Sequence, residues 1–215
     1  MIEQNLTERI VAGVYLPGDF LPNLTELMAE FGVSQPTMRE ALHLLESAGF
    51  IRLKRGPNGG SQVCAPDHAD VVRALDALFR YRKTTPAQVL EVRLLLEPAA
   101  TRLAAVNATD EELLSLPIIV EGERERDVIV DPYKFHEAKQ KFHRQIAEMS
   151  RNPVISTLSH SLSDLALQIA IDARFAIEDR EISVRQHEQI ADKLMKRDAD
   201  GAERAISDHL RQFLM

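Results

Sequence analysis

Several classes of protein are excluded by what this sequence of 215 residues lacks. It has no tryptophan, and its single cysteine, Cys64, allows neither an internal disulfide nor a cysteine-ligated zinc site. No run of residues approaches the roughly 20 apolar positions of a membrane span, and no signal-peptide pattern opens the chain. We therefore expect a cytoplasmic protein with no membrane partner. Aromatic residues make up 5% of the chain, so its core must be mostly aliphatic.

Positive charge is also scarce. The chain has 26 Lys and Arg against 33 Asp and Glu, a net charge of −7, which by itself argues against a nucleic-acid partner. Residues 1–66 contain seven acidic residues and five basic ones, namely Arg9, Arg39, Arg52, Lys54 and Arg55. Four of these cations lie between positions 39 and 55. Because phosphates are contacted locally, this clustering matters more than the total charge.

The first third of the chain predicts two short helices followed by a hairpin. Asn23 and Glu26 form a capping-box pattern, and Gly32 ends the helix that they begin. A second amphipathic helix follows almost at once and ends at Gly49, which makes the pair a helix-turn-helix. Within residues 50–64, apolar and basic residues alternate from Ile51 to Lys54, and a glycine-rich turn follows at 56–60. This pattern is typical of a β-hairpin. Together these elements predict a winged helix.

The rest of the chain is mostly helical in pattern. We predict helices at 71–82, 86–106, 109–116, 131–150, 153–178, 183–197 and 200–214. Thr109, Ser183 and Asp200 are candidate caps, and the stretch from Ile118 to Asp131 is predicted as a loop or irregular connection. The fold class is therefore mostly α. It comprises a winged helix-turn-helix domain at 1–66, a polar linker at 67–70 and an all-α helical-bundle domain at 71–215.

A set of short segments in residues 6–66 has a specific order and spacing. The segments are Ile10-Val-Ala-Gly-Val-Tyr-Leu-Pro-Gly18, Leu21-Pro22, Glu26-Leu27, Phe31-Gly-Val-Ser34, Thr37-Met-Arg-Glu-Ala-Leu42, Leu45-Glu-Ser-Ala-Gly-Phe-Ile51 and Arg55-Gly-Pro-Asn-Gly-Gly60. In this combination they resemble the DNA-binding domain of GntR-family transcription regulators. The resemblance implies that double-stranded DNA is a partner.

The second helix of such a domain lies in the major groove, with its N-terminal residues nearest the base edges. Arg39 is the candidate for base readout, since its planar fork matches guanine O6 and N7. Its alternative role is an ion pair with Glu40 or Glu46. Hydroxyl groups at the helix start suit phosphate oxygens, and glycines at the wing tip permit close approach to the minor groove. The predicted DNA-binding set is Thr25, Ser34, Gln35, Thr37, Arg39, Lys54, Arg55, Gly59 and Gly60.

Two members of this set depart from the family pattern. The family usually has arginine at the positions of Gln35 and Thr25. Glutamine can pair with adenine through two hydrogen bonds. We therefore expect either an operator in which the usual guanine contact is replaced or weaker binding to DNA.

The second part of the chain also resembles a known domain. Glu91-Val-Arg93-Leu-Leu-Leu-Glu97, Phe142-His143, Asn152-Pro153, His187 and His209 are similar to the FCD domain, the helical effector domain of the FadR-type branch. The resemblance implies a small helical bundle that binds a metabolite, often an organic acid beside a divalent metal, and that controls a dimeric repressor. It also implies that Arg93 faces the effector cavity, where its guanidinium would suit a carboxylate. The alternative role for Arg93 is a surface ion pair with Glu97.

Three histidines are the candidate metal ligands. His143, His187 and His209 lie on different predicted helices, and imidazoles that converge in a bundle can hold Zn²⁺ or a similar divalent ion. Metal-binding relatives have aspartate four residues before the first histidine, where this chain has Lys139. A protonated lysine cannot ligate a metal and repels it. Two accounts stay open: the histidines hold a metal, or Lys139 replaces it and binds an anionic effector. A solvated Lys139 is the third possibility.

The sequence therefore predicts a ligand-responsive transcription regulator, a repressor rather than an enzyme. It would bind a palindromic operator as a homodimer and respond to a small organic acid, with Arg93 and Lys139 as effector-binding residues. Two alternatives remain. One is a three-histidine metal-dependent hydrolase with an appended domain. The other is a regulator whose helical domain only dimerises.

Overall fold

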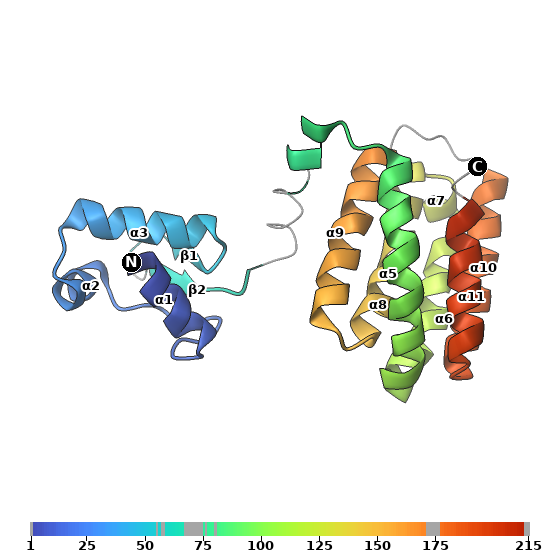
Figure 1. The fold of residues 1–215 in the computed structure, drawn as a ribbon, viewed down its shortest axis with the longest axis horizontal. Helices are drawn as coiled ribbons and strands as arrows, with labels where there is room; N and C mark the ends of the chain where they lie inside the picture. The colour runs from blue at the N-terminus through green and yellow to red at the C-terminus, as the bar shows by residue number, and fades with distance from the viewer. Residues whose placement is uncertain are drawn as a thin grey trace. The chain divides into compact units, whose positions relative to one another are not determined.

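The chain divides into two compact units, residues 1–71 and 72–215. The computed structural model describes residues 2–54, 56, 59–66, 75, 77–79, 81–170 and 177–212 (Figure 1). The predicted linker 67–70, the predicted wing residue Arg55 and half of the predicted helix 71–82 lie outside these residues. The boundaries between domains and linker stay a prediction. Among the described helices, none is long and apolar enough to cross a membrane.

The N-terminal unit is the predicted winged helix. Its helices are α1 (Ile2–Val11), α2 (Leu24–Phe31) and α3 (Gln35–Ser47), and its hairpin is β1 (Ile51–Lys54) with β2 (Gly60–Val63). The capping box at the start of α2 is present, and the glycine that ends it has the left-handed conformation, with φ of 63°. The helix-turn-helix and the two-stranded wing are thus confirmed.

The wing is a two-stranded hairpin, and the segment before α2 binds to its second strand. The two strands pair antiparallel, with Ile51 opposite Val63 and Lys54 opposite Gly60. On the other side of β2, the Leu21 N–H donates to the Ser61 carbonyl at 2.9 Å. The hairpin and all three helices share an aliphatic core made of Leu6, Leu21, Leu27, Met38, Leu42, Leu45, Ile51 and Val63. This packing leaves the outer face of α3 exposed.

The second unit is an all-helical bundle, as predicted. Its helices are α5 (Pro86–Asn107), α6 (Asp110–Arg124), α7 (Arg126–Ile129), α8 (Pro132–Met149), α9 (Pro153–Ala170), α10 (Ile177–Met195) and α11 (Ala199–Arg211). Helix α5 packs against α8, α9 and α11, and α10 packs against α6 and α11. The long helices alternate in direction, so α5, α8 and α10 run the same way (Figure 1). A mainly aliphatic cluster, including Leu116, Ile190, Leu194 and Ile206, fills the interior.

The predicted loop between Ile118 and Asp131 is wrong. Helix α6 continues to Arg124 through Pro117 and Gly122, and the short α7 follows it. The local helix-breaking signals of proline and glycine are overridden because Leu116 and Val120 are buried on one face of the helix.

Two predicted caps are also wrong. Helix α10 covers Ile177–Met195, so Ser183 lies buried in its interior instead of capping it. Asp198, not Asp200, caps α11 by accepting a hydrogen bond from the Gly201 N–H at 2.9 Å. Thr109 does cap α6, as predicted. Single side chains do not identify a helix start when two candidates lie close together in the sequence.

Candidate functional site

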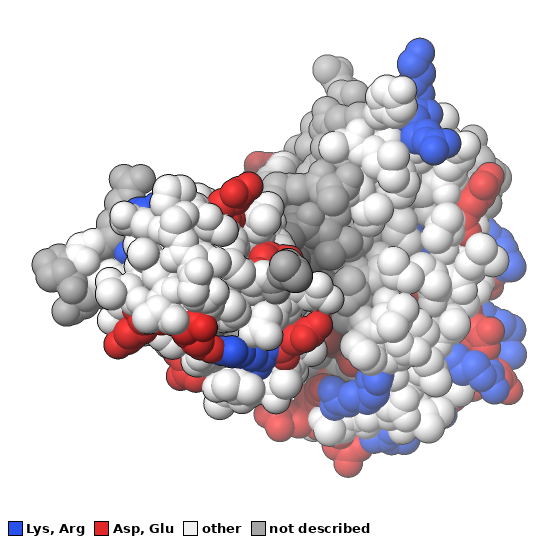
Figure 2. All heavy atoms as spheres, turned by 60° about the vertical axis from the view of Figure 1, so that its left-hand side comes forward, with Lys and Arg blue, Asp and Glu red and all other residues white. Residues whose placement is uncertain are grey.

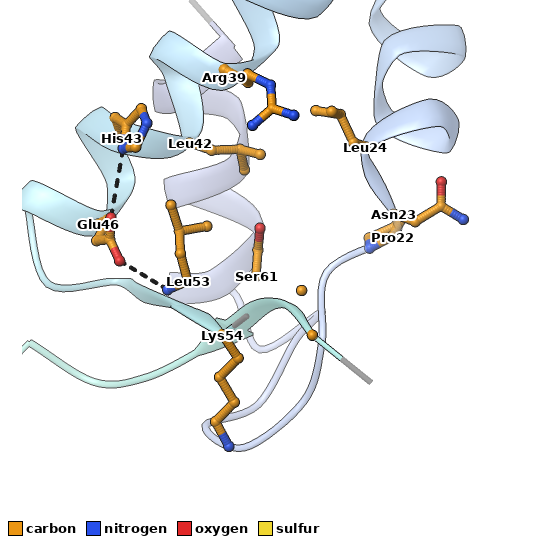
Figure 3. A pocket seen from close by; sticks show the side chains of 12 residues that line it. Pro22, Asn23, Leu24, Arg39, Leu42, His43, Glu46, Leu53, Lys54 and Ser61 are labelled. Carbon is orange, nitrogen blue, oxygen red and sulfur yellow. Dashed lines mark hydrogen bonds and ion pairs between the residues drawn. The ribbon is translucent and has the colours of Figure 1, made fainter. Parts of the chain in front are cut away.

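A groove of about 600 Å³ lies between α3 and the wing (Figure 3). Arg39, His43 and Glu46 line it from α3, and Lys54 lines it from β1. Leu42, Leu53, Ser61, Gly59, Gly60 and the start of α2 complete the walls. Four residues of the predicted DNA-binding set therefore line one groove: Arg39, Lys54, Gly59 and Gly60.

The other described members of this set lie at helix starts. Gln35 and Thr37 are in the first turn of α3, after its N-cap Ser34, and Thr25 is in the first turn of α2. All four are exposed. The Ser34 hydroxyl lies 2.9 Å from the Thr37 hydroxyl and caps no backbone amide. These side chains and the first amides of α3 are thus accessible to a phosphate.

Arg39 is exposed where it borders the groove. Within the part of the chain that the structure describes, no salt bridge joins Arg39 to Glu40 or Glu46. Glu46 instead accepts a hydrogen bond from the Leu53 N–H at 2.9 Å. On the face shown in Figure 2, basic and acidic side chains are mixed and form no broad basic surface.

The second candidate site is a buried cluster of three histidines in the helical bundle. His143 on α8, His187 on α10 and His209 on α11 are at most 5% exposed. One ring nitrogen of each lies within 4.8 Å of the others. The ring centroids are 4.6 to 5.4 Å apart. The structure therefore brings together the three residues that the sequence predicts, and they could hold a metal ion.

An acceptor outside the cluster fixes the orientation of each ring. His143 Nδ1 lies 2.8 Å from a Glu97 oxygen, and His187 Nδ1 lies 2.9 Å from both oxygens of Glu123. His209 Nδ1 lies 2.8 Å from the amide oxygen of Gln186. A carboxylate can only accept, so the Nδ1–H groups of His143 and His187 must donate, and the amide oxygen of Gln186 likewise accepts from His209 Nδ1. This is the arrangement by which neighbouring groups set the tautomer of metal-binding histidines.

The inner nitrogens of the three rings fit a cation. A neutral ring that donates from Nδ1 has a lone pair on Nε2, and the Nε2 atoms of His187 and His209 face each other at 3.2 Å. The Nε2 of His143 is buried and has no hydrogen-bond partner among the described residues. Burial keeps the pKa of His209 well below its usual value, which favours the neutral ring. Lone pairs that converge in this way are stabilised by a bound divalent ion.

Burial and close partners determine the charges around the cluster. Burial alone would raise the pKa of Glu97, but Arg93 and His143 hold it well below its usual range. Burial lowers the pKa of His143 to about 3, against the opposing effect of Glu97. Burial, helped by Arg93 and opposed by Glu123, also lowers the pKa of Lys139 to about 8. At neutral pH the site therefore has a carboxylate at Glu97, a neutral ring at His143 and a mostly charged Lys139.

The two predicted effector residues lie beside the histidines. Arg93 is 6% exposed, and its Nε donates to Glu97 Oε1 at 2.5 Å. The ion pair with Glu97 therefore exists, but it is buried and not on the surface. Lys139 is also 6% exposed, so the solvated alternative for this residue is wrong. Arg93 and Lys139 lie one helical turn before Glu97 and His143, on helices that run the same way (Figure 1).

Comparison with known proteins identifies the family. Residues 88–212 match the FCD domain, and residues 1–59 match the gntR family of bacterial regulatory proteins. The chain is 32% identical over 215 residues to the HTH-type transcriptional repressor NanR of Cronobacter sakazakii, covering 98% of this chain and 81% of that protein. The chain belongs to the GntR family. The NanR repressor of Salmonella newport is 30% identical, with the same coverage.

A solved structure shows the same GntR fold. The Streptococcus agalactiae GntR protein aligns with a TM-score of 0.80 at 22% identity, covering 99% of this chain and 97% of that one. Members of this family that match here are named as transcriptional repressors, not enzymes. The chain is accordingly a DNA-binding transcription regulator, and the hydrolase alternative is not supported.

Two residues of the GntR regulator's buried site are not predicted from the sequence. Glu97 is expected there only as a surface partner of Arg93, and Glu123 falls in the stretch predicted as a loop. The signal for Glu123 is its place on the apolar stripe of Leu113, Leu116 and Val120, where a carboxylate is unusual. A charged residue on an otherwise buried helix face indicates a buried partner.

Proposed function

We propose that this GntR-family chain is a homodimeric repressor that binds a palindromic operator and is released by a small carboxylate effector. Its similarity to NanR repressors over nearly the whole chain supports the repressor role. Symmetric half-sites are the expected match for two winged helices related by a two-fold axis. An operator lies on the chromosome, so we place the protein in the cytoplasm. The proposed domains remain 1–66 and 71–215, with a linker at 67–70.

The observation that carries the DNA-binding part is the groove between α3 and the wing, which Arg39 lines from α3 and Gly59 and Gly60 line from the wing. Lys54 lies on the wing at its edge, with its Nζ 5.9 Å from the centroid of the Phe20 ring (Figure 3). Arg39 would read a base edge, and Lys54 with the wing glycines would contact phosphate and sugar. Arg55, which lies outside the described residues, is proposed as a further wing contact. Thr25, Ser34, Gln35 and Thr37 would contact the adjoining backbone or base edges.

Selection of duplexes from a random library by the wild-type protein, followed by fluorescence anisotropy, tests this assignment. Arg39→Ala should weaken binding by about 5- to 150-fold, the range for losing a bidentate base contact. Arg52→Ala is the matched control, because Arg52 is an exposed wing cation that does not line the groove. Equal affinities and equal sequence preferences for the two variants would refute the proposed readout.

For the histidine cluster we propose a divalent metal site for Zn²⁺ or a similar ion, held through the Nε2 atoms of His143, His187 and His209. When bound, such an ion supplies a Lewis-acidic position for an effector carboxylate. Elemental analysis after dialysis against Zn²⁺ should find one ion per chain in the wild type and none in His209→Ala. The control is His43→Ala, which replaces an exposed histidine and should leave the metal content unchanged.

The account in which Lys139 takes the place of the metal makes the opposite prediction. No metal in the wild type but one ion per chain in Lys139→Asp would establish it. In both accounts the anionic effector is bound by Arg93 and Lys139. The Nη2 of Arg93 supports this, because it is buried and has no hydrogen-bond partner among the described residues.

A thermal-shift screen with organic acids and sugar acids tests the effector role. A binding acid should raise the melting temperature of the wild type and of the exposed variant Lys141→Met, but not of Lys139→Met. If no acid shifts the wild type, the helical domain only dimerises, and the effector proposal is wrong. Analytical ultracentrifugation with and without operator DNA measures the mass of the protein, which should be that of two chains.

A further inference from the structure

The groove between α3 and the wing contains an acidic side chain that DNA binding does not explain. Among the lining residues that the structure describes, Glu46 is the acidic one, and it shares the groove with Arg39 and Lys54. A carboxylate near phosphates weakens binding, because like charges repel. A compensating role for Glu46 is therefore expected.

The contacts of Glu46 supply that role. Its Oε1 accepts a hydrogen bond from the Leu53 N–H at 2.9 Å, which connects α3 directly to β1 (Figure 3). Its Oε2 lies 3.6 Å from His43 Nδ1, too far for a good hydrogen bond. The main partner of the carboxylate is thus the wing backbone.

The position of this bond makes it a determinant of wing placement. Strand β2 is held from the other side, where Gln62 Nε2 donates to the Gly18 carbonyl at 2.8 Å and the Val63 N–H donates to the Asp19 carbonyl. Within the described residues, strand β1 is joined to a side chain of α3 by the hydrogen bond from the Leu53 N–H to Glu46. Lys54 is the next residue after Leu53, so loss of this hydrogen bond would also shift the backbone of a proposed DNA contact.

We propose that Glu46 is a positioning residue for DNA binding. Its hydrogen bond holds the wing at the distance from α3 at which Lys54 and the wing glycines contact DNA while Arg39 lies in the major groove. This inference rests on the proposed function. The negative charge lowers affinity for phosphate, but the hydrogen bond raises affinity by more, since it orients the wing before DNA binds.

Two substitutions separate the charge from the hydrogen bond. Glu46→Ala removes both and should weaken binding to the duplex selected by the wild type about tenfold, equivalent to about 1.4 kcal/mol. Glu46→Gln removes the charge but keeps an acceptor oxygen, and should bind as tightly as the wild type or about threefold more tightly. Glu46→Asp keeps the charge on a shorter side chain and should bind more weakly.

The matched controls are Glu40→Ala and Glu40→Gln, because Glu40 is an exposed acidic residue of the same helix that does not line the groove. These two should have equal affinities. Amide hydrogen exchange provides a second measurement: Leu53 should exchange faster in Glu46→Ala and at the wild-type rate in Glu46→Gln.

Several results would overturn the inference alone. Equal tightening in Glu46→Ala and Glu46→Gln would mean that only the charge matters. Equal weakening in both, or no change in either, would mean that the hydrogen bond does not position the wing. If Glu46→Ala does not fold, Glu46→Asp and Glu46→Gln decide between these outcomes. A wild-type protein that selects no duplex would instead refute the proposed function and this inference with it.

Discussion

Glu97→Gln tests whether the buried polar centre of the helical domain is held together by charge. Glu97, Arg93 and His143 are each at most 6% exposed. The carboxylate accepts from Arg93 Nε at 2.5 Å and from His143 Nδ1 at 2.8 Å. Glutamine keeps an oxygen for one donor but removes the charge that neutralises the guanidinium, leaving a buried cation uncompensated. Breaking a buried ion pair in this way destabilises a protein by about 3–5 kcal/mol.

For a domain of about 150 residues, each kcal/mol corresponds to about 2–4 °C in melting temperature, so Glu97→Gln should melt roughly 10 °C below the wild type. The assay is thermal unfolding by circular dichroism with a chelator present, so that bound metal adds no stability. Glu91→Gln, an exposed change on the same helix, should melt like the wild type. The double variant Arg93→Met with Glu97→Leu should recover part of the loss, because apolar replacement of both partners removes the unpaired charge but leaves His143 Nδ1–H without its acceptor. A Glu97→Gln melting temperature within about 2 °C of the wild type, or a double variant no more stable than the single, would refute this account.

Three further predictions concern other parts of the molecule. Glu123→Ala should lower Zn²⁺ affinity by about 10- to 100-fold in a chelator competition assay, because the His187 ring loses the acceptor that orients it; Glu121→Ala, an exposed carboxylate on the same helix, should not. Burial lowers the pKa of Lys139 to about 8, so between pH 8 and about 10.5 the unfolded chain binds more protons and stability should rise with pH. Denaturant unfolding across that range should show a flatter rise in Lys139→Met than in Lys141→Met, and equal slopes would contradict the shift. Asn23→Ala should destabilise the winged helix by about 1 kcal/mol through loss of the capping box at α2, whereas Asn5→Ala, exposed on α1, should have little effect in the same experiment.

The winged helix was predictable because its signals are local. Asn23 and Glu26 cap α2 through contacts three residues apart, and Gly32 ends it through its own backbone conformation. The same reliance on local signals failed for α6. Gly122 and Pro132 suggested a loop between Ile118 and Asp131, but burial of Leu116 and Val120 against neighbouring helices stabilises α6 as far as Arg124.

By itself, the sequence determined the order of most of the helices and of the two strands, the family resemblance and the identity of the three histidines. Only the tertiary structure decided what surrounds them. Glu97 and Glu123 are far from their histidine partners in the chain, and their pairing depends on which helix faces which. The burial of Lys139 and the hydrogen bond from Leu53 to Glu46 are likewise products of packing. Local propensity is encoded over a few residues, whereas the environment of a side chain is fixed only when distant elements exclude water between them.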